Sequence, residues 1–338
     1  MRALLIGNYG VGNVGDEALR EYFLQRFADV EWTVVTNTWA APLRQGFEGQ
    51  AGSPTSPRLR GASGKREVPR LPFGLRSLFS MPWWSTVRAL RHSDAVVFGG
   101  GTLLTDVESV RACILWGMHV LACRLFGIPY MLAFQGIGPF RTVVGRAIAR
   151  SVVRHARFIS VRDNASAKRM ASWSLHTEVI QTFDPVFALL YEQKHEERTK
   201  NVNIIIPRAN SPASFLHRAV QLAAERSDEP VRALLFQPDD PSEKAIAVSL
   251  QAAISRLQIM PVRTVEELHT GLTDGHFVLT QRYHGAIAAL ACGVPFETVA
   301  QGEGDKLAAV AALQRDRPQD LGALVQIGEE ALRQALKG

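Results

Sequence analysis

The sequence predicts an α/β fold of two doubly wound, Rossmann-like domains that face each other across a cleft. Short runs rich in Val and Ile alternate with longer segments of helical periodicity, which is typical of parallel sheets covered on both faces. The chain has 338 residues, which exceeds the size at which one hydrophobic core keeps growing. A charged stretch over 191–200 interrupts the alternation before it resumes. We therefore expect an N-terminal domain over 1–190 and a C-terminal domain over 191–338.

The elements expected in the first half follow from this alternation. Its strands are short apolar runs at 3–6, 32–36, 95–98, 130–134, 158–161 and 178–180. Its helices are the longer segments at 16–27, 110–126, 144–155 and 165–172. Ligands of such sheets bind outside the carboxyl ends of the strands, so the functional residues are expected in the loops that follow them.

The second half repeats the pattern with its own strands and helices. Strands are expected at 202–206, 233–236, 259–262, 277–279 and 295–300, and helices at 214–225, 242–257 and 285–291. By contrast, the segment 42–76 has five prolines and seven basic residues against two acidic ones. We expect a mobile insertion there, either a solvated loop or a basic flap over an anionic or membrane-borne substrate. Trp83 and Trp84 follow it as candidate interfacial anchors.

Composition narrows the classes of function. Hydrophobic residues make up 46% and charged residues 21% of the chain, as in a globular enzyme. The formal charge of +6 favours anionic partners without requiring nucleic acid. Three cysteines without metal-type spacing predict neither disulfides nor a zinc site. The N-terminus lacks a signal peptide pattern and no apolar stretch is long enough to span a bilayer, so we expect a cytoplasmic protein.

Three glycine-rich loops follow strands of the first half. The first, over 7–17, contains a G-x-G-x-x-G pattern, but the second strand ends at Asn37 without the carboxylate that would hold a dinucleotide ribose. Asp16 and Glu17 fall in the first turn of the next helix, where they either complement the helix dipole or take part in chemistry. The other two loops, over 98–102 and 135–139, complete one wall of the expected cleft.

Basic side chains stand at strand ends in both halves. Arg162 ends one strand and is placed to bind a carboxylate or phosphate, unless it pairs structurally with Asp163. Arg282 and His284 precede a helix in the second half, where His284 is a candidate site residue or a core histidine. Lys306 lies beyond the last strand and is expected to reach the same pocket.

These pieces together resemble the polysaccharide pyruvyl transferases. The matching motifs are the loop over 7–17, Gly99-Gly100-Gly101, Gln135-Gly136-Ile137-Gly138-Pro139, Val161-Arg162-Asp163, Asp184-Pro185, Arg282-Tyr283-His284-Gly285 and Gly293-Val294-Pro295. They occur in the order of that family over about residues 1–310. The family commonly has a Tyr-Asp-Pro-Lys type of sequence where this chain has 302–306, and the 42–76 insertion has no counterpart that we can match.

The resemblance implies a fold like that of the GT-B glycosyltransferases, with an acceptor-binding N-terminal and a donor-binding C-terminal domain. It implies phosphoenolpyruvate as donor, with no further cofactor, and as acceptor a saccharide of cell-surface polysaccharide synthesis that is often lipid-linked. The product would be a pyruvate ketal. Nucleic acid is not an expected partner, membrane contact would be peripheral at the inner face, and no metal is expected because the acidic residues show no ligand spacing.

The resemblance, together with the chemistry of ketal formation, assigns roles to individual residues. Arg162, Arg282 and Lys306 would bind the donor, and His284 would be the general acid or the proton donor to the leaving phosphate. Asp16 or Glu17 would accept the proton of the attacking hydroxyl. Further substrate contacts are expected from Asn8, Gly10, Gly12, Asn13, Gly100, Gly101, Gln135 and Gly285. Two alternatives remain, a GT-B glycosyltransferase that uses a nucleotide sugar and a non-catalytic carbohydrate-binding relative.

Overall fold

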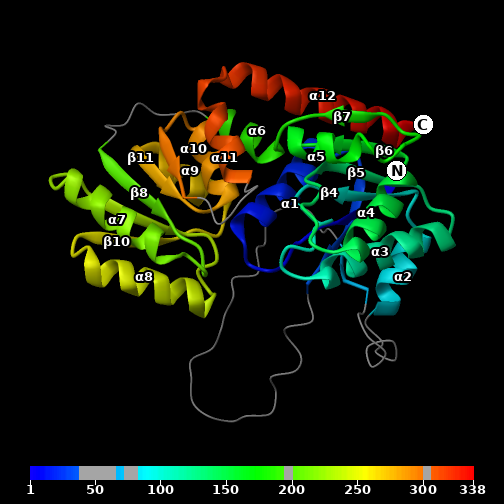
Figure 1. Ribbon diagram of the computed structural model, residues 1–338. Helices are drawn as coiled ribbons and strands as arrows, with labels where there is room; N and C mark the ends of the chain where they lie inside the picture. Colours follow the sequence, from blue (N-terminus) through cyan, green and yellow to red (C-terminus); the bar gives the residue numbers. More distant parts are fainter. Residues whose placement is uncertain (38–65, 72–82, 194–200, 300–305) are drawn as a thin grey trace, which may run out of the picture.

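The computed structural model describes residues 1–37, 66–71, 83–193, 201–299 and 306–338. It contains two parallel β-sheets, each covered by helices on both faces and placed side by side (Figure 1). The predicted α/β class with two doubly wound sheets is confirmed. The expected domain boundary near residue 191 falls between the last strand of the first sheet and the first strand of the second.

The first sheet has seven strands in the order β3-β2-β1-β4-β5-β6-β7, and every neighbouring pair is parallel. The order runs outward from the centre in two directions, so the switch point lies between β1 and β4, where Leu5 pairs with both Val34 and Val97. The strands are β1 (Arg2–Ile6), β2 (Glu31–Thr36), β3 (Arg66–Pro69), β4 (Ala95–Gly99), β5 (Tyr130–Gln135), β6 (Phe158–Val161) and β7 (Val179–Gln181).

Helices bury the two faces of this sheet in separate apolar clusters. Leu5 and Val97 face one cluster and Leu4 and Val96 face the other, because side chains alternate along a strand. The first face is covered by α1 (Val14–Arg26), α6 (Pro185–Tyr191) and α12 (Pro318–Lys337). The second face is covered by α2 (Trp83–Arg91), α3 (Val110–Leu125), α4 (Val143–Arg154) and α5 (Asn164–Met170).

The second sheet has five parallel strands in the order β10-β9-β8-β11-β12. They are β8 (Val202–Ile206), β9 (Val231–Leu235), β10 (Leu257–Pro261), β11 (Gly275–Thr280) and β12 (Phe296–Thr298). Its helices are α7 (Ala213–Glu225), α8 (Pro241–Ala253), α9 (Val265–Thr273), α10 (Tyr283–Ala291) and α11 (Lys306–Ala312), and a short 3-10 turn, Leu313–Arg315, follows them. The inner face of this sheet shares one continuous core with the first sheet.

Several elements differ from the expectation: strand β3 and helices α2, α6, α9, α11 and α12 were not predicted. Residues 66–69 form the edge strand β3, with Val68 buried and paired with Val35, so the irregular structure expected over 42–76 is wrong there. The rest of that segment, apart from Arg70 and Leu71, lies outside the described residues. Helix α12 was not predicted, and it packs on α6 and on the strands β5, β6 and β7 of the first sheet. Within the described residues, none of the helices combines the length and apolar character needed to cross a membrane.

Candidate functional site

The three glycine-rich loops lie at the carboxyl edge of the first sheet, as predicted. Gly10, Gly12, Gly100 and Gly101 have φ between 73° and 78°, which glycine adopts without the strain of a side chain. Gln135 is fully buried and its amide donates to the carbonyls of Phe98 and Gly100 at 2.9 Å, so it holds the second loop in place. The loops form the first-sheet wall of the site.

Arg162 stands at the end of β6 and is almost fully buried between the two sheets. It forms an ion pair with Asp184, the residue that caps α6, and donates to the Thr102 hydroxyl at 3.1 Å. Its guanidinium also lies 4.3 Å from the ring centroid of Tyr283, which belongs to the second half. Asp163 instead caps α5, accepting from the amide of Ser166 at 2.7 Å. Arg162 is therefore a fixed cation that touches both halves.

His284 lies in the first turn of α10 and faces Arg162 across the gap between the sheets. Its Nε2 is 3.5 Å from the Arg162 Nη1 and 3.8 Å from an Asp184 carboxylate oxygen. The ring packs on Gly15 of α1, where an added Cβ would lie 2.0 Å from Nδ1. Burial lowers the pKa of His284 to about 4, although the negative charge of Asp184 opposes this shift. The imidazole is therefore neutral at pH 7, and its contact with Asp184 is not an ion pair.

Lys306 begins α11 and reaches across to the first sheet. Its ammonium donates to the hydroxyl of Thr102, the same atom that accepts from Arg162. Burial and then the charge of Arg162 lower the pKa of Lys306 to about 7. The structure thus brings together three of the predicted residues, Arg162, His284 and Lys306, around a threonine that the sequence analysis did not single out.

Asp16 and Glu17 are neighbours in the first turn of α1, but they face different partners. Asp16 is buried and accepts from the side-chain amides of Asn8 at 2.9 Å and Asn13 at 3.1 Å. Burial raises the pKa of Asp16 to about 6, although the hydrogen bond from Asn8 opposes that shift. Glu17 accepts from the backbone amide of Gly10 at 2.7 Å and so stabilises the loop.

Arg70 is a site residue that the sequence analysis missed. Its guanidinium donates to the side-chain oxygen of Asn8 at 3.0 Å and to the carbonyl of Gly7 at 3.3 Å. The same group lies 5.1 Å from the ring centroid of Trp116 on α3. Arg70 orients Asn8, which in turn donates to Asp16. No signal in the sequence indicates this role, because Arg70 lies in a segment whose composition suggests irregular structure and its partners are distant in the sequence.

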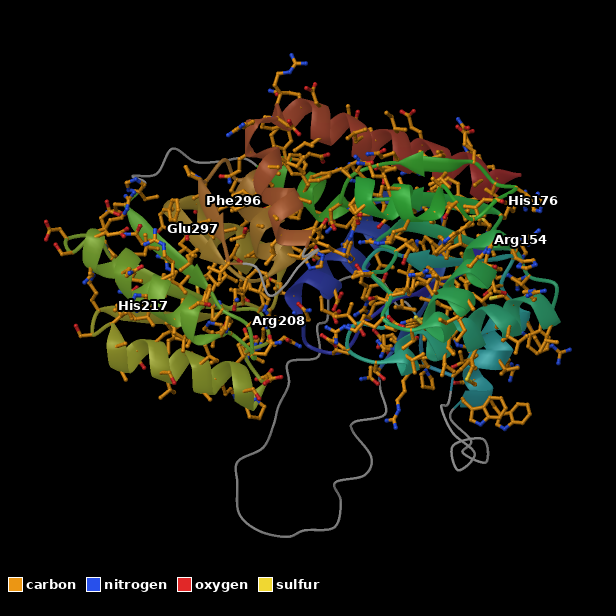
Figure 2. All side chains as sticks on the ribbon, in the orientation of Figure 1. Arg154, His176, Arg208, His217, Phe296 and Glu297 are labelled. Atoms are coloured by element: carbon orange, nitrogen blue, oxygen red, sulfur yellow. The ribbon has the colours of Figure 1, made fainter. Side chains whose placement is uncertain are left out.

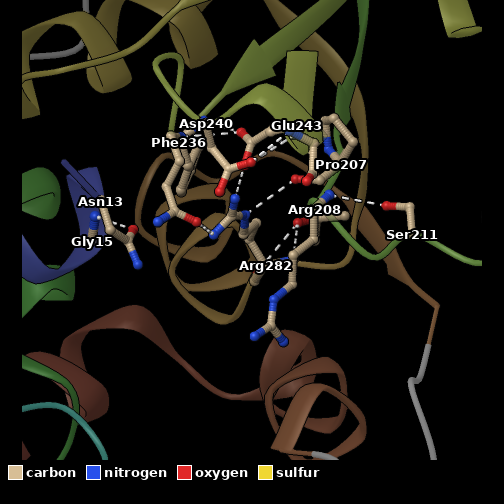
Figure 3. A network of polar contacts seen from close by, with 12 residues as sticks. Asn13, Gly15, Pro207, Arg208, Ser211, Phe236, Asp240, Glu243 and Arg282 are labelled. Atoms are coloured by element: carbon tan, nitrogen blue, oxygen red, sulfur yellow. Dashed lines mark hydrogen bonds and ion pairs between the residues drawn. The ribbon is translucent and has the colours of Figure 1, made fainter. Parts of the chain in front are cut away.

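Arg282 does not join the cluster around Thr102. Its guanidinium is turned into the second half, where it forms an ion pair with the buried Glu243 and donates to the Gln237 side chain at 3.0 Å and the Pro207 carbonyl at 3.2 Å (Figure 3). Burial and then the charge of Arg208 lower its pKa to about 10. Because these contacts occupy the side chain, Arg282 fixes the start of α10, where Gly285 packs against Thr280 and Ile206.

A cavity of about 350 Å³ lies between the two halves beside these residues. Its lining includes Asn8, Asn13, Arg208, Gln281, Arg282 and His284. The amide of Val14 donates to the carbonyl of Phe236 at 3.1 Å, which joins the first glycine loop to the second sheet. Across the parts of the chain that the structure describes, no three His, Cys, Asp or Glu side chains are grouped to hold a metal ion.

Solved structures with a similar fold include enzymes that act on nucleotide sugars. The UDP-GlcNAc 2-epimerase from Neisseria meningitidis bound to UDP-GlcNAc is 13% identical with a TM-score of 0.59, covering 99% of this chain and 100% of that one. The UDP-GlcNAc 2-epimerase from Methanocaldococcus jannaschii is 11% identical with a TM-score of 0.57, covering 100% of both chains. S. aureus MnaA in a co-structure with UDP is 14% identical with a TM-score of 0.54, covering 97% and 91%.

At these identities the likeness shows the fold, which is of the GT-B type. No curated protein matches the chain. The model of the polysaccharide pyruvyl transferase family matches residues 13–300, a range that includes Arg162, Asp184 and His284. The chain therefore belongs to the polysaccharide pyruvyl transferase family.

Proposed function

We propose that the protein transfers the enolpyruvyl group of phosphoenolpyruvate to a saccharide, forming a pyruvate ketal and releasing phosphate, in the synthesis of cell-surface polysaccharide. The observation that carries the proposal is the convergence of Arg162 and Lys306, from the two halves, on Thr102 beside His284. Membership of the pyruvyl transferase family supports the class of reaction.

The donor carries a phosphate and a carboxylate, so its site needs several fixed hydrogen-bond donors. Charge-assisted hydrogen bonds contribute about 1.5–3 kcal/mol each. Arg162 and Lys306 supply two cations, and the first turn of α10 adds amides that no side chain caps. Arg282 acts on the donor through the start of α10 and through its charge at the cavity wall.

His284 protonates the methylene carbon of the donor, which makes C2 electrophilic toward the first sugar hydroxyl. The imidazole is neutral in the free protein, and the negative charge of a bound donor raises its pKa toward the value that an acid catalyst needs. Asp16, which ionises near pH 6, accepts the proton of that hydroxyl. The C2–O bond to phosphate then breaks, with phosphate keeping the electron pair, and the second hydroxyl attacks C2. The methyl group thus gains its proton from His284, the phosphate gains the proton of the second hydroxyl, and exchange with solvent returns the proton held by Asp16 to His284 for the next turnover.

The test is phosphate release and mass spectrometry of saccharides incubated with phosphoenolpyruvate and the protein. The wild type is expected to release phosphate and to add the mass of one pyruvate ketal. Because a positioned general acid contributes about 10²- to 10⁴-fold, His284→Ala should lower phosphate release by that factor while the circular dichroism spectrum is retained. The matched control is His217→Ala, an exposed imidazole on α7 (Figure 2). Near-normal release by His284→Ala contradicts the assignment.

A nucleotide-sugar transferase is the second candidate, because the structural neighbours include proteins solved with UDP or UDP-GlcNAc. Calorimetric titration with UDP and with phosphoenolpyruvate separates the two. Binding of phosphoenolpyruvate alone supports the pyruvyl transferase, and binding of UDP alone supports the alternative. A carbohydrate-binding relative without activity would bind saccharide and release no phosphate.

A further inference from the structure

The outer surface of α2, α3 and α4, which we call the arginine face, carries charge of one sign. These three helices cover the second face of the first sheet, opposite α12 (Figure 1). They contain no Asp or Glu. Their arginines are all exposed: Arg88, Arg91, Arg111, Arg124, Arg146, Arg150 and Arg154. Such a distribution is unusual on a helix surface, where opposite charges normally alternate.

Ion pairs with carboxylates are lacking on this face among the described residues. None of the guanidinium groups of its arginines forms an ion pair within the described part of the chain, although Arg91 lies 5.6 Å from the ring centroid of Phe126. The carboxylates nearest in sequence have other partners: Asp94 pairs with Arg2, and Glu108 with Arg208. Asp106 is buried and accepts from the amide of Thr142 at 2.8 Å. The positive potential of the face is therefore not cancelled locally.

Large apolar side chains are exposed among these arginines. The described chain has nine large hydrophobic residues with exposed side chains, and six of them lie on or next to α2, α3 and α4: Trp84, Leu121, Leu125, Phe126, Val143 and Val144. Leu125 is 74% and Val143 is 85% exposed. On α3 the positions 111, 114, 118, 121 and 125 follow helical spacing, and all but Arg111 are apolar. The outward side of α3 thus carries an apolar stripe in which Leu121 and Leu125 are exposed and Ile114 and Met118 are half-buried.

We propose that the arginine face binds the surface of a bilayer that contains anionic phospholipid. Exposed Leu and Val side chains and Trp84 can enter the interface, while arginine stems lie along it and their guanidinium groups reach phosphate oxygens. Arginines and exposed apolar residues are interspersed over three helices without a single carboxylate, a pattern that suits anionic headgroups lying beside acyl chains. The proposal does not depend on the reaction that the protein catalyses.

The test is sedimentation of the protein with vesicles of phosphatidylcholine alone or of phosphatidylcholine with phosphatidylglycerol. We expect binding to the anionic vesicles only, with loss of binding as salt is raised. Arg150→Glu with Arg154→Glu should weaken binding by about tenfold or more, because each basic residue near an anionic surface contributes to attraction. Leu121→Ser with Leu125→Ser should weaken it as well. The matched control is Lys244→Glu with Val248→Ser, an exposed charge and an exposed apolar residue on α8.

Thermal unfolding of each variant shows whether its fold is retained, and phosphate release with a water-soluble saccharide reports on the site separately. Equal binding to both kinds of vesicle, or equal binding by the arginine-face and α8 variants, overturns the proposal. A third outcome would also overturn the proposal. If the wild type does not bind anionic vesicles but self-associates, and the double variant Leu121→Ser with Leu125→Ser is monomeric, the arginine face contacts a second copy of the chain.

Discussion

The side chains around Thr102 carry less positive charge than their residue types suggest. Lys306 has a pKa of about 7 and His284 of about 4, because both are buried near Arg162. At pH 7 the free protein thus has one permanent cation here, Arg162, beside a lysine whose pKa lies near that pH and a neutral imidazole. An anionic donor would stabilise the protonated forms of both groups, so donor binding is expected to take up protons.

The pH dependence of kcat/KM for phosphoenolpyruvate should follow from two groups, Asp16 on α1 and Lys306 on α11. Asp16 must be ionised to act as a base, so activity rises through about pH 6, and Lys306 must be charged to bind the donor, so activity falls above about pH 7. Lys306→Arg keeps the charge to higher pH and should move the falling limb upward. An unchanged limb in that variant would show that Lys306 does not set it.

Gly15→Ala should displace the ring of His284. An added Cβ would lie 2.0 Å from Nδ1, so the imidazole must move, and a misplacement of this size can cost about 10²-fold in rate. Alanine is favoured over glycine inside a helix by about 0.5–1 kcal/mol, and this gain partly offsets the cost of moving the ring. We therefore expect a large loss of turnover with little change in the free energy of unfolding. Steady-state kinetics beside thermal unfolding measures both, and normal turnover would show that the ring position is not needed.

The sequence predicted the principal site residues because each follows a strand end with a clear signal. Arg162 and His284 lie beside glycine or helix-start motifs, and the structure brings them within 3.5 Å. Their catalytic roles stay predictions. Thr102, Arg70 and Glu243 were missed because their importance comes from partners distant in sequence. Glu243 in particular resembles an ordinary first-turn carboxylate of α8, yet it forms an ion pair with Arg282, which follows β11, two strands away from β9 in the second sheet.

At the level of helices and strands, the parallel strands were predictable because buried strands are continuous apolar runs. Edge strand β3 was not, since its four residues include Arg66, Glu67 and Pro69, and only Val68 is buried. Helix α12 did have a usable signal, with Leu321, Val325, Leu332 and Leu336 on one side. Its docking on the first sheet could not be deduced, because amphipathic spacing shows which side is buried and not against what.

The contact of α12 with the first sheet can be tested with two glycines of the same helix. A Cβ at Gly328 would lie 2.6 Å from both Phe134 and Thr182 side-chain atoms, whereas a Cβ at Gly322 meets nothing within 4 Å. Gly328→Ala should therefore destabilise the protein by about 1–3 kcal/mol through overpacking. Gly322→Ala should stabilise it by about 0.5–1 kcal/mol. Chemical denaturation measures both, and equal effects would mean that α12 does not pack as described.

The two sheets together share one core, which includes Leu5 and Phe134 from the first and Ile204 and Leu234 from the second. Continuous burial of this kind couples the unfolding of one half to that of the other. We expect differential scanning calorimetry to give a single transition whose calorimetric and van't Hoff enthalpies agree. Two separable transitions would show that the halves unfold independently.

The chain passes from the first half to the second after α6 and comes back before α12, which packs on β5, β6 and β7. Two covalent connections restrain the motion of one half relative to the other more than a single connection does, because both connections must change conformation together. We therefore expect the cavity between Asn8 and His284 to open by a hinge rotation of one half against the other, about an axis that passes through the two connections. A fluorescent group attached beyond Lys337 would move with the first half, although it follows the second half in the sequence.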